Sequence, residues 1–346
     1  MENYVNSNAT TENSSAEIVG ESKVDTVDNP GIQSKKSDRR RKISWKKDFQ
    51  QNWSVYLLFL PAFIFFLVLS YFPMFGIVMA FENFKISKGF FGSDWVGFNN
   101  FKRLFDDVYF WKSLGNTAAI GLLKITVGFI MPIIFAVLLS LLRSKKYKRT
   151  VQTLSYMPNF VAAVVICALL GEFVGTNGPL SVMFAKIFHT KSTNWLASNT
   201  PLFWFLYVFM GIWQGIGWGS IMYVASISMV NGDLHEAAAL DGATRMQRLF
   251  HITIPCILPM IVMMFVMNVG LSFTTGFENV LLLQMPSTYD FSDTVYTYTY
   301  RFSFMNGNKD YALSAASGLF QSVIGTILLV GSNKLSKKLT GGISLF

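Results

Sequence analysis

The side chains that most often carry out chemistry are few and widely spaced in this sequence. His235 and His251 stand 16 positions apart, a spacing that does not fit a zinc site. Cys167 and Cys256 are too far apart for a Cys-x-x-Cys metal site and too few for a disulfide framework. The sequence also lacks the GxxxxGK(S/T) loop that binds nucleotide phosphates. We therefore expect no enzyme activity, no metal and no cofactor bound by this chain.

The most distinctive polar segment, residues 231–255, predicts two short helices within one loop. Asp233 is followed three residues later by Glu236, and this pair resembles a capping box at a helix start. Gly242 supplies the left-handed position that ends the first helix. The alanines at 237–239 combine high helix propensity with little bulk, so that another protein could approach closely. An amphipathic connector lying at the membrane interface, without special function, would also have this composition.

Apolar runs fill most of the remaining sequence. A bilayer-spanning helix needs about 20 apolar residues, and runs of about that length lie at 55–82, 113–142, 158–175, 201–229, 254–283 and 311–332. Hydrophobic residues make up 51% of the chain and charged residues only 14%, which excludes an ordinary soluble domain. The pattern predicts an all-α polytopic membrane protein with six transmembrane helices.

The distribution of Lys and Arg predicts the orientation of these helices. Six crossings place both termini and the loops after the second and fourth runs on one side. That side carries 18 Lys and Arg and the other side carries nine. Because positively charged loops stay in the cytoplasm, we expect both termini inside. The basic residues mostly flank apolar runs, which indicates contact with membrane lipid and argues against a nucleic-acid partner.

The sequence divides into two parts by composition. Residues 1–50 form a cytoplasmic tail that is polar over 1–34, where we expect disorder, and then basic, with eight Lys and Arg in 35–47. Residues 51–346 form the six-helix membrane domain, and its largest cytoplasmic connection is the loop 230–253.

Three ionisable residues lie inside the apolar runs and away from their ends: Lys124, Glu172 and Glu278. An ionisable group at that depth usually faces a cavity or a partner, and a lysine can also snorkel toward the interface. We hypothesise that Lys124 pairs with one of the two acids.

Several short motifs together indicate a family. The run Glu236-Ala237-Ala238-Ala239-Leu240-Asp241-Gly242-Ala243 resembles the EAA loop of binding-protein-dependent ABC importer permeases. The similarity extends to Ile252-Thr253-Ile254-Pro255, Leu258-Pro259, Trp95-Val96-Gly97-Phe98, Ser113-Leu114-Gly115-Asn116-Thr117 and Asn177-Gly178-Pro179, and covers roughly residues 50–346. Within that family the sequence is most similar to the carbohydrate branch of maltose-type and lipo-/oligosaccharide permeases.

The resemblance implies a type I ABC importer permease in a bacterial cytoplasmic membrane that transports a carbohydrate, in particular an oligosaccharide. It implies three partners: a second homologous permease subunit, cytoplasmic ATP-binding subunits that hydrolyse ATP, and an extracellular substrate-binding protein. Carried onto this sequence, Glu236, Ala237, Ala238 and Gly242 would dock into a cleft of the ATPase. The alternative is a stand-alone secondary transporter or channel, which would need coupling-ion carboxylates or inverted repeats that are not evident here.

Sugar sites combine hydrogen-bonding side chains with aromatic rings, and two of the runs offer such mixtures. The fourth run contains Trp213 and Gln214 among glycines that could instead serve close helix packing. The fifth run is unusually polar, and its candidates for the substrate path are Asn268, Ser272, Phe273, Phe277, Glu278 and Asn279.

Overall fold

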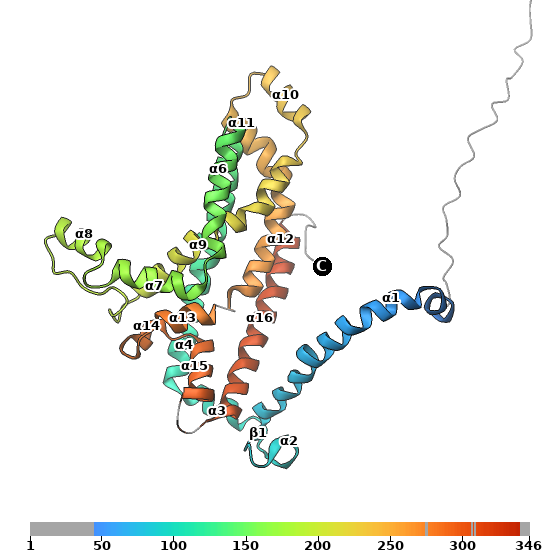
Figure 1. The fold of residues 1–346 in the computed structure, drawn as a ribbon, viewed down its shortest axis with the longest axis vertical. Helices are drawn as coiled ribbons and strands as arrows, with labels where there is room; N and C mark the ends of the chain where they lie inside the picture. Colours follow the sequence, from blue (N-terminus) through green and yellow to red (C-terminus); the bar gives the residue numbers. More distant parts are fainter. Residues whose placement is uncertain (1–44, 274–275, 306, 308, 340–346) are drawn as a thin grey trace, which may run out of the picture. The chain divides into compact units, whose positions relative to one another are not determined.

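The computed structural model describes residues 45–339, except 274, 275, 306 and 308. The tail 1–34 and the start of the basic segment lie outside the described residues. The chain separates into two units, Met1–Phe65 and Phe66–Phe346. The described part of the first unit belongs to α1 (Trp45–Phe66), which contains Pro61. The second unit contains all the other elements (Figure 1).

Six segments of the described chain are long and apolar enough to cross a membrane, which confirms the prediction. They are Phe49–Phe81, Val108–Leu141, Ala163–Ile187, Leu202–Ser228, Arg245–Ser272 and Tyr311–Lys338. A helix satisfies the hydrogen bonds of its own backbone, and this is why apolar runs of this length become helices in a lipid environment.

Two of the predicted runs have different limits in the structure. The run 254–283 is not one helix, because α12 (Ile254–Ser272) ends before α13 (Phe277–Leu283) begins. The run 158–175 yields a short α7 (Ala163–Val174), followed by α8 (Pro179–Ile187). Hydropathy reports where a chain is apolar, but it does not report where a helix is interrupted.

The second span contains a local change of helix type. It begins with α4 (Val108–Leu123), passes through the π-helical turn η3 (Lys124–Gly128), and continues as α5 (Phe129–Leu141). The fourth span is the single helix α9 (Leu202–Ser228), and the sixth lies in α16 (Tyr311–Leu339). Helix α9 packs along α5, and α12 packs along α16.

Shorter elements lie within the spans or connect them. The remaining helical turns are η1 (Leu67–Tyr71), η2 (Phe72–Phe81), α2 (Gly89–Gly92), α3 (Asn99–Asp106), α6 (Lys145–Tyr156), η4 (Met157–Phe160), α10 (Gly232–Leu240), α11 (Arg245–Arg248), η5 (Leu249–Thr253), η6 (Pro286–Thr288), α14 (Tyr289–Ser292), α15 (Val295–Tyr300) and η7 (Arg301–Met305). Strands β1 (Glu82–Asn83) and β2 (Asp94–Trp95) pair antiparallel, with Glu82 opposite Trp95. In the second unit, α10 lies at one end and α3 and β1 lie at the other (Figure 1).

The motif Trp95-Val96-Gly97-Phe98 has a structural explanation at the latter end. The amides of Val96 and Gly97 both donate to the carbonyl oxygen of Phe81, at 2.9 and 3.0 Å. The Trp95 ring stacks on the Phe81 ring, with 5.7 Å between their centroids. Gly97 has a φ of 58°, a conformation that glycine adopts readily. The motif therefore fastens the β2 connection to the end of η2.

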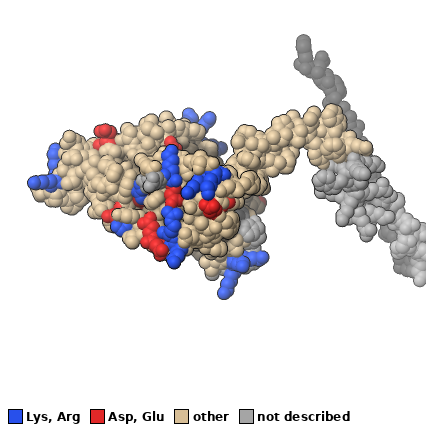
Figure 2. Space-filling view, turned by 90° about the horizontal axis from the view of Figure 1, so that it is seen from below, with Lys and Arg blue, Asp and Glu red and all other residues tan. Residues whose placement is uncertain are grey.

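All four ion pairs of the described residues belong to this end of the molecule, whose surface shows basic and acidic side chains among uncharged ones (Figure 2). They are Lys88–Asp94, Arg103–Asp310, Lys112–Asp290 and Arg301–Asp293. By the expected orientation this end faces the outside of the cell.

The Arg301–Asp293 pair lies at the centre of a buried polar cluster between α4 and the segment 290–301. Arg301 Nη2 lies 2.6 Å from Asp293 Oδ2, and the Asp293 side chain is only 4% exposed. Ser113 and Thr297 also donate to the Asp293 carboxylate. Burial raises the pKa of Asp293 above its usual range, even though these neighbours stabilise its charged form.

The same cluster explains the motif that begins at Ser113. Asn116 Nδ2 donates to the carbonyl oxygens of Asp290 and Asp293, and Thr117 Oγ1 accepts from the amide of Val295. All of these side chains are buried except that of Asp290. The motif therefore holds the connection between the fifth and sixth spans against the start of the second.

We expect Asp293→Ala to destabilise the protein strongly. Removing one partner of a buried ion pair leaves an uncompensated charge on Arg301 and typically costs about 3–5 kcal/mol. The matched change Asp94→Ala breaks an exposed pair with Lys88 and should cost about 1 kcal/mol or less. Thermal unfolding of the detergent-purified protein measures both, and equal unfolding temperatures for the two variants would contradict the assignment.

Candidate functional site

The cytoplasmic loop forms the short helix that the sequence predicts, but with a different cap. Asn231 caps α10, and its Oδ1 accepts from the amide of Asp233 at 3.0 Å. The expected capping box of Asp233 and Glu236 is therefore wrong, because the helix begins at Gly232 and places Asp233 inside its first turn. The Asp233 carboxylate there complements the positive end of the helix dipole. Glu236 is exposed.

The end of α10 matches the prediction for Gly242. Its φ is 80°, and its amide donates to the carbonyl oxygen of Ala239 at 3.2 Å. The next amide, that of Ala243, donates to the carbonyl oxygen of Ala238 at 2.9 Å. These two bonds form a Schellman motif, which closes the helix and turns the chain sharply.

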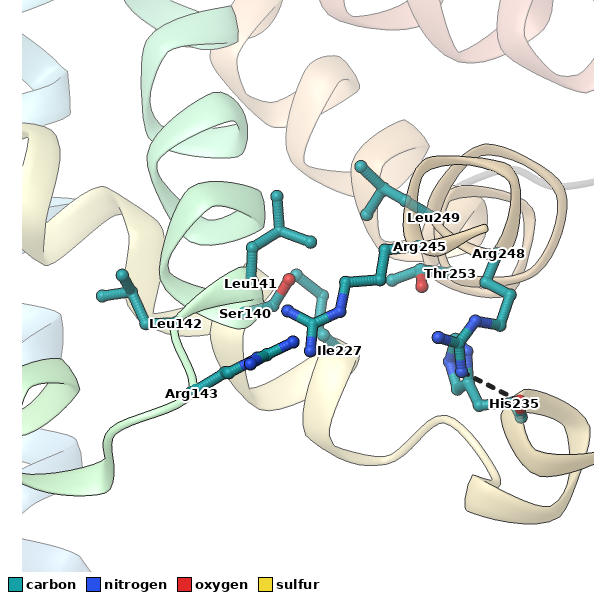
Figure 3. A pocket seen from close by; sticks show the side chains of 10 residues that line it. All are labelled: Ser140, Leu141, Leu142, Arg143, Ile227, His235, Arg245, Arg248, Leu249 and Thr253. Carbon is teal, nitrogen blue, oxygen red and sulfur yellow. Dashed lines mark hydrogen bonds between the residues drawn. The ribbon is translucent and has the colours of Figure 1, made fainter. Parts of the chain in front are cut away.

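The return segment is fixed to α10 by one arginine. Thr244 and Gln247 form a capping box at the start of α11. Arg248 Nη1 then donates to the carbonyl oxygen of His235 at 3.1 Å, a bond that joins α11 to α10 (Figure 3). The chain continues without a break through η5, where Leu249 is buried, into α12. The helix α10 is therefore attached to the first turns of the fifth span.

One exposed face of α10 is apolar and uncovered. Leu240 is 90% exposed and Leu234 is 49% exposed. Together with the exposed Ala237 they stand three residues apart, which places them on adjacent positions of one helix face. A fully exposed leucine at the tip of a projecting loop is suited to contact another protein.

A second site lies within the spans. A cavity of about 370 Å³ is bordered by η3, α5, α9, α12 and the start of α13. Its polar lining comes from Lys124, Tyr207, Asn268 and Asn279. Gly211 and Gly215 form part of its wall, and a Cβ at either position would meet no atom within 4 Å. The volume is within the range of small-molecule sites.

Lys124 lies in this cavity without a carboxylate partner among the described residues. Its Nζ lies 5.2 Å from the centroid of the Tyr207 ring, within the range of a cation–π contact. Neither Glu172 nor Glu278 forms an ion pair with it, so the structure does not show the hypothesised pairing. Its positive charge is therefore not neutralised by the described part of the chain.

The structure brings together two of the predicted substrate-path residues, Asn268 and Asn279, at this cavity. The others lie elsewhere. Ser272 is buried and donates to its own helix, the Phe273 carbonyl accepts from Gln321, and the Phe277 ring packs on Tyr300. Glu278 is exposed, and Gln214 donates to the carbonyl of Val161. Trp213 lies two residues from both Gly211 and Gly215, which places it on the opposite face of α9 from the cavity.

Sequence reasoning did not identify Tyr207 as a site residue. A signal was present, because Tyr207, Gly211 and Gly215 recur at intervals of four residues and so share one face of a helix. Favouring close helix packing as the role of those glycines left the tyrosine without a role.

Comparison with known proteins matches the chain to a transport family and to relatives over most of its length. The family described as "Binding-protein-dependent transport system inner membrane component" matches residues 128–340. The polygalacturonan/rhamnogalacturonan transport system permease protein YteP of Bacillus subtilis is 35% identical over 305 residues, which is 88% of this chain and 93% of the relative. Protein LplB of the same organism is 33% identical and covers 86% of this chain, with 92% of its own length matched.

Two solved structures share the fold. A crystal structure of a bacterial ABC transporter involved in the import of the acidic polysaccharide alginate matches 85% of this chain and 99% of its own, with a TM-score of 0.77 and 33% identity. The bacterial alginate ABC transporter in complex with an alginate pentasaccharide-bound periplasmic protein matches 86% and 99%, also with a TM-score of 0.77 and 33% identity.

These matches confirm the resemblance found in the EAA-like loop and favour an importer over a stand-alone transporter or channel. A permease carries substrate across the membrane and is not itself an enzyme. The chain belongs to the family of binding-protein-dependent transport system inner membrane components, as a multi-pass permease subunit of an ABC importer.

Proposed function

We propose that this permease imports an acidic oligosaccharide and that separate ATP-binding subunits drive it through α10. The substrate class is supported by the relatives, since YteP is named for polygalacturonan and rhamnogalacturonan and the matching structures belong to an importer of alginate. The observation that carries the proposal is the lysine in the cavity between the spans, which has no acidic partner among the described residues.

Lys124 is suited to receive a uronate carboxylate. A charge-assisted hydrogen bond is about twice as strong as a neutral one, and it is stronger still where water is excluded. The neighbouring side chains suit the rest of a sugar, because Asn268 and Asn279 can bond hydroxyls. The glycine positions in α9 keep the required space open.

The partners follow from the exposed surfaces. The apolar face of α10 suits a groove on a cytoplasmic ATPase, with Glu236, Ala237, Ala238 and Gly242 at or near the contact. At most 28% of the apolar window of any span is buried within the chain, which leaves ample surface for lipid and a second permease subunit. A binding protein on the outer side would deliver the sugar.

We expect Lys124→Gln to reduce uptake of an acidic oligosaccharide by about tenfold or more, because a hydrogen bond to a charged group contributes roughly 1.5–3 kcal/mol. Uptake of the same oligosaccharide with its carboxylates reduced to alcohols should not fall. Lys124→Arg should retain most of the uptake, and Lys102→Gln, which changes an exposed lysine on α3, is the control. Equal losses for the charged and the reduced sugar would reject Lys124 as the carboxylate-binding group.

We expect Gly242→Ala and Glu236→Lys to reduce both uptake and ATPase association. An L-residue at a φ of 80° costs about 1–2 kcal/mol and weakens the Schellman motif. Gly232→Ala, at an unstrained position of the same helix, is the matched control. Copurification of the ATPase with membrane-extracted permease measures association, and membrane insertion should be unchanged. Normal association in both loop variants would remove α10 as the coupling element.

A further inference from the structure

A strongly basic pocket lies where the cytoplasmic loop meets the ends of the spans. Its volume is about 380 Å³, and three arginines and one histidine line it: Arg143, Arg245, Arg248 and His235. No acidic residue is among the side chains that line it. Figure 3 shows the guanidinium groups of Arg143 and Arg245 pointing toward each other across the pocket.

These cations are not neutralised by the described part of the chain. Arg143 and Arg245 form no ion pair there. Arg248 donates from Nη1 to a carbonyl oxygen, while its buried Nε has no hydrogen-bond partner. Two like charges that face each other repel, and each helix end that meets the pocket, those of α5 and α9, supplies only about half a negative charge. The three arginines therefore keep a net positive charge.

We infer that this pocket binds the phosphate headgroup of an anionic phospholipid of the cytoplasmic leaflet. Arginine forms bidentate hydrogen bonds with phosphate oxygens, and two facing guanidinium groups can hold one phosphate between them. Basic pockets between transmembrane helices on the cytoplasmic side are suited to anionic lipid headgroups.

The position of the pocket favours a lipid over an acidic group of the ATPase. Its walls come from the ends of the second and fourth spans, through Leu141, Leu142 and Ile227, and from Leu249 near the start of the fifth span. These apolar side chains would lie against the glycerol and the first acyl carbons. The exposed face of α10, with Ala237 and Leu240, does not line the pocket.

A bound headgroup would also stabilise the loop. Arg143 follows the second span, whereas Arg245 and Arg248 belong to α11 and His235 belongs to α10. One phosphate between them would link these three elements, so lipid composition would affect how firmly α10 is held.

The test uses the purified importer complex in nanodiscs of phosphatidylcholine, with or without phosphatidylglycerol. Native mass spectrometry counts retained phosphatidylglycerol, and thermal unfolding reports stabilisation. We expect phosphatidylglycerol to be retained by the wild type and to raise its unfolding temperature. The double variant Arg143→Gln/Arg245→Gln should need at least about tenfold more phosphatidylglycerol for the same effect. Arg149→Gln, which changes an exposed arginine on α6 outside the pocket, should behave as the wild type.

Three results would overturn the proposal. The first is equal retention of phosphatidylglycerol by the wild type and the double variant. The second is full stabilisation by inorganic phosphate in phosphatidylcholine nanodiscs, which would identify a free anion as the ligand. The third is loss of the ATPase by the double variant in phosphatidylcholine alone, which would identify a protein carboxylate. If the double variant does not fold, the single change Arg143→Gln at an exposed loop position gives the same comparison.

Discussion

The satisfaction of backbone hydrogen bonds in lipid is the constraint on which the rest of this structure depends. Irregular backbone at membrane depth is tolerated only where protein buries it or where it lines a cavity. The π-helical turn at Lys124–Gly128 and the interruption between Ser272 and Phe277 both obey this rule, since Lys124, Gly276 and Asn279 border the same cavity. Helix interruptions beside a cavity between spans are typical of transporters, where they free polar groups for substrate.

The cavity and the cytoplasmic loop are joined by continuous structure. From Gly242 the chain passes through α11 and η5 into α12, which ends at Ser272, next to the interruption that borders the cavity. Arg248 fastens α10 to the first turn of this path through the His235 carbonyl. A force on α10 would therefore reach the cavity along one helix, which is the physical link that the proposed coupling requires. The polar cluster around Asp293 holds the opposite end of the second span.

The sequence predicts the features that depend on composition and local conformation, and misses those that depend on distant contacts. The apolar runs predict six spans, and Gly242 is correctly placed as a left-handed helix end. The Asp293 cluster joins residues separated by as many as 180 positions, so no local pattern indicates it. The cap of α10 is misplaced because Asn231 and Asp233 are both good capping residues.

The hypothesis for Lys124 fails for a related reason, and its failure is informative. Opposite charges inside a membrane usually pair, so the sequence favoured an acid as its partner. The structure instead pairs its charges at the end that bears α3 and β1, where the four ion pairs of the described residues lie. Among the described residues, Lys124 and the arginines around the cytoplasmic pocket have no acidic partner. An unpaired cation inside a span is costly for stability, since desolvation is not offset by an ion pair. This cost applies to Lys124, for which we propose the substrate as the missing anion. Arg143 and Arg245 are exposed, and for them the proposed anion is a lipid headgroup.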